Sequence, residues 1–247
     1  MNNYFTKDYI GEAFIFLGSH HLVVLTLLLF IYVALFFWRV SLNKIPLATH
    51  IETTKRRFRY GLAFVLLVNE MTWHAWNYFN GIWTVQTMLP LHLCSVLVFL
   101  SAVMLITKNR ILYEVDYFLG IGGALQAILT PDLGIYGFPH LRFFQVFISH
   151  GGIVLAALYM TVIEKYRPNW YSLLRVLCII TIYALIVGVI NAWLGSNYLF
   201  IAHKPETPSL IDILAPHPWY IFELAGIALF TFFILYLPFA IKDWGKI

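Results

Sequence analysis

Residues 22–38 read LVVLTLLLFIYVALFFW and contain no charged side chain. A helix needs roughly 17–25 mostly apolar residues to cross the hydrocarbon core of a bilayer, so this stretch predicts a transmembrane helix. Residues 1–19 lack the basic segment that opens a signal peptide, and no small-residue cleavage site follows the run. We therefore expect the run to be retained as the first span of the protein.

The composition of the whole chain indicates the same class of protein. Hydrophobic residues make up 61% of the 247 residues and charged residues only 11%, whereas a soluble domain carries about 25% charged residues. The aromatic content of 18% suits two interfacial belts of Trp and Tyr. The formal charge of +4 comes from basic residues in short loops between apolar runs, so it indicates membrane orientation rather than a nucleic-acid partner.

Six further apolar runs predict an all-α, polytopic membrane bundle of seven transmembrane helices in a single domain, residues 1–247. Lys and Arg collect in cytoplasmic loops of membrane proteins. If the N-terminus lies outside and the C-terminus in the cytoplasm, 13 of the 16 Lys and Arg residues fall on the inner side. The seven predicted spans are Leu22–Trp38, Phe58–Trp76, Leu89–Ile106, Leu112–Leu129, Leu141–Ile163, Leu173–Leu194 and Trp219–Ile241.

Two segments differ from the simple pattern of apolar runs and short loops. The fourth run, Leu112–Leu129, contains Asp116 and three glycines, and small residues permit close packing between membrane helices. Asp116 and the neighbouring Glu114 are expected to pair with basic residues at the inner surface. The outer segment from Gly195 to Pro218 contains four prolines, which stiffen it and suit it to a lid.

Given this topology, most polar side chains within the spans gather in the outer half of the membrane. Ionisable groups are costly in lipid, and they face the bundle interior or a wet cavity by default. We therefore expect a polar cavity that opens outward, walled by the second, third, fifth, sixth and seventh spans. The polar residues expected there include Glu70, His74, His92, Cys94, Gln126, His150, Asn191 and Asn197.

Two elements of this set suggest general-base chemistry. Glu70 and His74 are one turn apart on the same helix face. Such a pair orients an imidazole and raises its basicity, although it also serves as a structural ion pair between helices. His150 lies in mid-span beside Gly151 and Gly152, which permit close approach of a ligand or a second backbone.

Cys94 is a candidate nucleophile, because a Cys near a His suggests a thiolate. His92 is two residues away and points to another side of a helix, so His150 is the candidate base for Cys94. The alternative is that Cys94 is a small buried residue without a chemical role. Cys178 is expected near the opposite face of the membrane, too far from Cys94 for a disulfide, which needs Cα atoms within about 7 Å.

Several stretches resemble the YwaF-type bacterial integral membrane proteins, and they occur in order along nearly the whole chain. This family is similar to a eukaryotic multispanning acyltransferase that remodels ether phospholipids through a Cys and a His, and more distantly to the androgen-induced-gene membrane hydrolases of lipid esters. The matching stretches are Ser19–His21, Leu89–Cys94, Gly120–Gln126, Leu129–Asp132, Phe144–His150, Asn191–Tyr198, Lys204–Pro205 and Pro216–Tyr220.

The resemblance implies a multi-pass protein of the bacterial plasma membrane that acts on a phospholipid or fatty-acyl substrate. Its catalytic His corresponds to His92. In the acyltransferase a Cys directly precedes that His, but Leu91 occupies this position here, and Cys94 is the candidate substitute because it shares a helix face with Leu91. The residues expected to bind substrate are His74, Gln126, Asn191, Asn197, Tyr198, Lys204, His217 and Trp219.

The sequence thus predicts a lipid acyltransferase or lipid-ester hydrolase with His92, Cys94, His150 and Glu70 as catalytic residues. The alternative is a transporter or binding protein for a small polar or anionic molecule, which needs no nucleophile. The chain has no Walker-type phosphate loop and no dinucleotide-binding glycine pattern, so no cofactor is expected. A metal held by three of the histidines stays open as a minor alternative, and the oligomeric state is left open.

Overall fold

The computed structural model describes residues 3–42, 48–205 and 210–244, and within these ranges all regular structure is helical. The segments α4, η2 and α5 follow one another without a break, and η2 is a π-helical turn. The elements are η1 (Asn3–Phe5), α1 (Ser19–Leu42), α2 (Ala48–Phe79), α3 (Leu93–Thr107), α4 (Arg110–Val115), η2 (Asp116–Gly120), α5 (Ile121–Leu129), α6 (Leu141–Val162), α7 (Trp170–Leu194), η3 (Tyr198–Phe200), η4 (Leu210–Ile213) and α8 (Trp219–Trp244).

Each predicted run coincides with a helical segment, so the all-α architecture is confirmed for the described residues. Helix α2 begins at Ala48, ten residues before its predicted run, and α3 begins later than predicted, at Leu93 and not at Leu89. Pro90 disfavours a helical conformation for the residue before it. His92 is extended, with φ −66° and ψ 148°, and forms the N-cap of the helix. Cys94 consequently lies in the first turn of α3.

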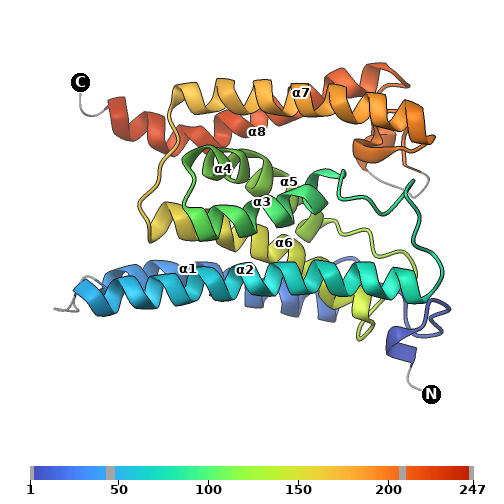
Figure 1. Ribbon diagram of the computed structural model, residues 1–247, viewed down its shortest axis with the longest axis horizontal. Coiled ribbons are helices and arrows are strands. Elements are labelled where there is room, and N and C mark those ends of the chain that lie inside the picture. Colours follow the sequence, from blue (N-terminus) through green and yellow to red (C-terminus); the bar gives the residue numbers. More distant parts are fainter. Residues whose placement is uncertain (1–2, 43–47, 206–209, 245–247) are drawn as a thin grey trace.

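Four of the described helices, α1, α6, α7 and α8, are long and apolar enough to cross a membrane. The protein is therefore of the multi-pass membrane type. The full count of seven spans and the direction of the chain stay predictions. The described ends of the chain, at η1 and at the end of α8, lie at opposite ends of the bundle (Figure 1), as an odd number of crossings requires.

The predicted orientation can be tested with reporters fused after Ile247. We expect a reporter that is active only in the cytoplasm to be active in this position, because 13 of the 16 Lys and Arg residues then lie on the cytoplasmic side. A reporter that requires export should be silent at the same position. The reverse pattern would place the C-terminus outside and overturn the predicted orientation.

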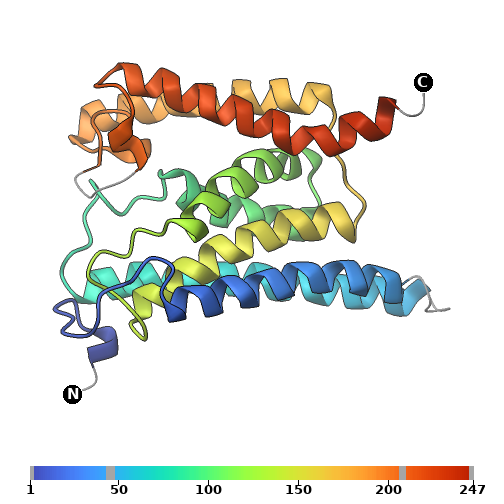
Figure 2. The ribbon, with the colours of Figure 1, turned by 180° about the vertical axis from the view of Figure 1, so that it is seen from behind.

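Helix α6 is the centre of the core. It lies between α1 and α2 on one side and α3 and α5 on the other (Figures 1 and 2), and 72% of its most apolar stretch is buried, against 6% in α8. Gly152 permits this close packing, because a Cβ there would lie 2.6 Å from Cδ2 of Leu66 on α2. Helices α7 and α8 form an outer layer with exposed apolar side chains such as Leu185 and Phe230, as expected for a surface that faces lipid.

The expected pairing of Glu114 with a neighbouring basic residue is confirmed, because its carboxylate lies 3.9 Å from Arg110 Nε, although Glu114 itself is buried. The expected surface pairing of Asp116 is wrong, because its side chain is buried and its partner is a hydroxyl group. Asp116 accepts a hydrogen bond from Ser101 Oγ on α3 at 2.6 Å. Glu114 forms an ion pair with Arg175 on α7. Helix α4 packs against both α3 and α7, and this packing encloses side chains that the sequence places near a loop.

A second group of charges, the Glu164 cluster, joins α2, α3 and the end of α6. The carboxylate of Glu164 lies 2.8 Å from Lys108 Nζ and 3.4 Å from Arg59 Nε. The Glu164 and Arg59 side chains are 6% and 7% exposed. Arg59 Nη1 also donates a hydrogen bond to the carbonyl oxygen of Leu105 at 2.6 Å. The cluster therefore compensates buried charges at the end of the bundle opposite the N-terminus.

Residues 3–18 form a segment, here called the strap, that runs across the end of the bundle where α1 and α6 begin. Trp76 Nε1 donates to the carbonyl oxygen of Phe5 at 2.7 Å, and Tyr136 OH donates to that of Lys7 at 3.0 Å. The ring of His140 lies 3.1 Å from the carbonyl oxygen of Thr6 through Nε2. Groups from α2 and from the α5–α6 loop thus hold the strap in place.

The hydrogen bonds of His140 define its tautomer. Nδ1 accepts the backbone N–H of Arg142 at 3.0 Å, so His140 caps α6 with its own side chain. A carbonyl oxygen only accepts hydrogen bonds, so Nε2 must carry the proton that is donated to Thr6. Protonation of Nδ1 would break the cap, and both contacts together require a neutral ring.

We expect the attachment of the strap to weaken in acid. Burial lowers the pKa of His140; its bond to Thr6 opposes this shift and the Arg142 charge adds to it. The stability that the neutral ring contributes is therefore complete above about pH 6.5 and is lost as the pH falls below that value. His140→Asn should reduce this dependence, because Asn caps a helix without titrating in this range. Hydrogen exchange of residues 3–9 between pH 8 and pH 5 is the measurement, and equal protection at both pH values would contradict the prediction.

Candidate functional site

The candidate site lies where α2, α3 and α6 meet. Glu70 on α2 is 4% exposed, and the charges of its carboxylate and of the Arg142 guanidinium on α6 attract each other. Cys94 lies on α3. Arg142 also interacts electrostatically with His150 on α6. Glu70, Cys94 and His150 thus lie on the three helices that meet at the site, and no hydrogen bond or ion pair joins them to one another within the described residues.

A hydrogen-bonded network holds Arg142 in position. Its guanidinium lies over the ring of Trp73, 4.4 Å from the centroid, and its Nη1 donates to Gln145 Oε1 at 2.6 Å. Gln145 Nε2 donates to Ser149 Oγ at 3.3 Å, and Asn69 Nδ2 donates to the same oxygen at 2.8 Å. The network ties α2 to α6 and fixes the cation beside Glu70.

Our sequence-based prediction of the site did not include Arg142, Asn69, Gln145 or Ser149. A signal for them was present, because Arg142, Gln145 and Ser149 recur at helical spacing on one face of a predicted span. Arg142 lies at the very start of the predicted span Leu141–Ile163, where a basic side chain is also compatible with the membrane surface. Its partners are on α2, and the pairing of the two helices is not encoded in the spacing of either one.

His74 does not have the free lone pair that a general base needs. Trp83 Nε1 donates to His74 Nδ1 at 3.1 Å, and an indole nitrogen can only donate. A neutral His74 must therefore carry its proton on Nε2, which faces Glu70 Oε1 at 3.6 Å. The predicted Glu70–His74 pair is formed, in an arrangement that orients His74 as a donor toward the carboxylate.

His150 has the opposite arrangement. Its Nδ1 lies 2.7 Å from the carbonyl oxygen of Val146, one turn earlier on α6. The carbonyl can only accept, so Nδ1 carries the proton and the lone pair of a neutral ring is on Nε2. Of the two candidate bases, His150 is the one whose hydrogen bonds leave a nitrogen available to accept a proton.

Cys94 is the second residue of α3, two positions after the N-cap His92. His92 makes no side-chain hydrogen bond to the first turn, so backbone N–H groups there remain available and favour negative charge nearby. In the described part of the chain no hydrogen bond joins Cys94 to His92 or to His150, and an imidazole partner for the thiol stays a prediction. Both cysteines are free thiols, which confirms that Cys94 and Cys178 form no disulfide.

The imidazole of His92 lies against the aromatic rings of the outer loop. Its ring centroid is 5.1 Å from that of Tyr198 and 5.0 Å from that of Phe200. Tyr198 OH donates to the carbonyl oxygen of Val85 at 2.7 Å and accepts the backbone N–H of Leu89 at 2.9 Å. Tyr198 thus attaches the outer loop to the segment that leads into α3, and His92 lies at this junction.

The other predicted substrate-binding residues of the outer loop are engaged within the loop itself. Asn191 Oδ1 accepts from Ser196 Oγ and from the backbone of Tyr198, and its Nδ2 donates to the Tyr198 carbonyl. Asn197 bonds in the same way to the backbone of residues 202 and 203. Lys204 Nζ donates to the carbonyl oxygen of Leu214 at 2.7 Å. These contacts account for a folded loop, and a role of these side chains in binding substrate stays a prediction.

The remaining predicted substrate-binding residues lie on the surface. Gln126 on α5 and His217 before α8 are exposed, and Trp219 is 63% exposed at the start of α8. Within the described residues, none of these side chains has a hydrogen bond to Glu70 or to the network around Arg142. Among those residues there is also no group of three or more His, Cys, Asp or Glu side chains that could hold a metal ion.

Comparison with known proteins gives one match. No curated protein and no solved structure matches the chain. The profile of the TMEM164 family matches residues 16–236, which includes the whole of α2, α3 and α6 and every residue of the candidate site. The match covers most of the 247 residues, so the chain belongs to the TMEM164 family of transmembrane proteins.

Proposed function

We propose that this protein is a membrane-embedded enzyme that cleaves an acyl ester of a lipid and transfers the acyl group to water or to a second lipid. The observation that carries the proposal is the proton arrangement of His150, whose Nδ1 bonds to the Val146 carbonyl oxygen and leaves Nε2 unprotonated in the neutral ring. Membership of the TMEM164 family and the four apolar helices support a lipid-related role. Intramembrane ionisable groups are functional candidates by default.

The chemistry requires a base, a nucleophile and stabilisation of an oxyanion. In our proposal His150 Nε2 takes a proton from water or from the hydroxyl group of an acceptor lipid, and the resulting nucleophile attacks the ester carbonyl. The available N–H groups at the start of α3 stabilise the oxyanion that forms. The tetrahedral intermediate then expels the lyso-lipid alkoxide, which receives the proton from His150. In this proposal the opposite charges of Glu70 and Arg142 offset each other in the region of His150.

Replacing Cys94 tests whether the thiol takes part in this reaction. We expect Cys94→Ala to keep the release of lyso-lipid from phospholipid nanodiscs within about threefold of the wild type, because the route through His150 does not need a thioester. Mass spectrometry of the lipid products is the measurement, with Cys94→Ser as the isosteric control. A loss of about 10³-fold or more in Cys94→Ala, with capture of an acyl group on the wild-type thiol, would instead assign Cys94 as the nucleophile.

The alternative, a transporter or binding protein for a small polar or anionic molecule, has less support. It assigns substrate contacts to Asn191, Asn197 and Lys204, whose polar atoms already bond within the outer loop. A transporter would move solute into vesicles without releasing lyso-lipid. An esterase would release lyso-lipid without moving solute.

We further propose a seven-span protein of the bacterial plasma membrane, of the YwaF type suggested by the sequence.

A further inference from the structure

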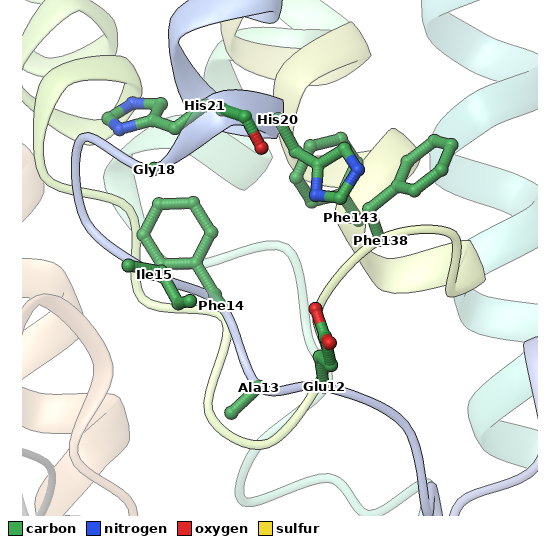
Figure 3. A pocket seen from close by; sticks show the side chains of 10 residues that line it. Glu12, Ala13, Phe14, Ile15, Gly18, His20, His21, Phe138 and Phe143 are labelled. Carbon is green, nitrogen blue, oxygen red and sulfur yellow. The ribbon is translucent and has the colours of Figure 1, made fainter.

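A pocket of about 70 Å³ lies between the strap, the start of α1 and the α5–α6 loop (Figure 3). A buried water needs roughly 10–15 Å³ by this measure, so the pocket has room for about five groups of that size. The side chains that define its chemistry are those of Glu12, Phe14, His20, Phe138 and Phe143. None of these residues belongs to the candidate site at α2, α3 and α6.

Close backbone contacts preform the pocket. The strap passes so near the α5–α6 loop at Gly137 that a Cβ there would lie 2.1 Å from the carbonyl oxygen of Glu12. On the other side, His21 Nδ1 accepts the backbone N–H of Leu17 at 3.2 Å. The Nε2 of the same ring bonds to the carbonyl oxygen of Ile128 at 2.9 Å. The backbone of the strap is thus fixed on both sides of the pocket, and the exposed Glu12 side chain extends from this fixed backbone.

The lining combines one carboxylate with several aromatic faces. The Glu12 carboxylate points into the pocket, toward the side on which His20 and Phe138 lie (Figure 3). The rings of His20 and Phe138 are stacked, with centroids 4.5 Å apart. Phe143 also borders the space, and neither Lys nor Arg is among the lining residues. A carboxylate with aromatic faces recognises a cation, and this combination is typical of sites for ammonium groups.

The position of the pocket indicates where such a cation comes from. Helices α1 and α6, both long enough to span a membrane, begin beside the pocket at Ser19 and Leu141. The start of a span lies at the level of lipid headgroups. Ile15 and Phe16 of the strap are 65% and 56% exposed, as suits side chains that enter the lipid interface.

We propose that this pocket binds an ammonium group, with Glu12 as the counter-charge and the aromatic rings as its walls. The ammonium belongs to the headgroup of a zwitterionic lipid or to a free amine of the same chemistry. The site recognises charge and shape and forms no covalent bond. It does not depend on the proposed ester chemistry, and it is tested by binding rather than by turnover.

The test uses the purified full chain in detergent and native mass spectrometry to measure retained lipid. We expect the wild type to retain phosphatidylcholine over phosphatidylglycerol, which has no ammonium group. Glu12→Gln should reduce this preference about tenfold, because a neutral amide replaces the counter-charge. Glu52→Gln is the matched control, since Glu52 is an exposed carboxylate on α2 at the opposite end of the bundle, and it should leave the preference unchanged. Glu12→Lys should reverse the preference toward phosphatidylglycerol.

A second arm distinguishes the two sources of the cation. Tetramethylammonium chloride is added to lipid-free protein, and the thermal unfolding midpoint is measured. Stabilisation of the wild type but not of Glu12→Gln, without any lipid preference, would assign the pocket to a free amine. Equal retention of both lipids by the wild type together with no effect of tetramethylammonium would overturn the proposal. An unchanged lipid preference in both Glu12→Gln and Glu12→Lys would also overturn the proposal. If either Glu12 variant fails to fold, Phe138→Leu is the further variant, because it keeps the Glu12 charge and removes one aromatic wall of the pocket.

Discussion

His150→Gln is expected to lower the release of lyso-lipid by about 10²–10⁴-fold, the contribution of a positioned general base. Gln is close in size and can still donate to the carbonyl oxygen of Val146, which His150 Nδ1 contacts at 2.7 Å. It has no group that accepts a proton in the neutral pH range. The lost activity therefore reports the missing base rather than a missing hydrogen bond, and kcat should fall more than the affinity for lipid.

His74→Gln is the matched control for this experiment. His74 lies on α2 beside the same Glu70, but Trp83 occupies its lone pair. Its replacement should reduce turnover by less than about tenfold, because no proton transfer is lost. Equal loss in the two variants would remove the basis for assigning His150 as the base. Full activity of His150→Gln would reject the proposed mechanism.

Glu164→Ala is expected to lower the free energy of unfolding by about 3–5 kcal/mol, because it leaves the buried guanidinium of Arg59 without a carboxylate partner. Arg59 is 7% exposed at its side chain and would lose the carboxylate that lies 3.4 Å from its Nε. Lys108 would lose its 2.8 Å contact with the same group. Denaturant unfolding of the detergent-solubilised chain, followed by Trp fluorescence, is the measurement.

An exposed ion pair at the same end of the bundle gives the comparison. Glu52 is 61% exposed and lies 3.0 Å from Lys55 Nζ. Such pairs contribute about 0–1 kcal/mol, so Glu52→Gln should be nearly neutral. If Glu164→Ala were equally neutral, the Glu164 cluster would be a surface feature that water compensates, contrary to its burial.

The sequence was sufficient to predict the helices of this protein. Runs such as Leu22–Trp38 are apolar over the whole circumference of a helix, and helix formation satisfies every backbone group within one segment. The signal is therefore local, and each predicted run coincides with a helical segment. The burial of Glu70 was also predictable, since an ionisable group is costly in lipid and faces the bundle interior by default.

The tertiary structure alone decided which polar groups meet and where their protons lie. His74 and His150 are equivalent as residue types, but one accepts from Trp83 and the other donates to Val146. The position of Asp116 near a loop predicts a place at the inner surface, but packing of α3 and α7 around α4 encloses this part of the chain. These outcomes depend on contacts between helices distant in sequence, and the spacing of residues within one helix carries no information about the neighbour that it will face.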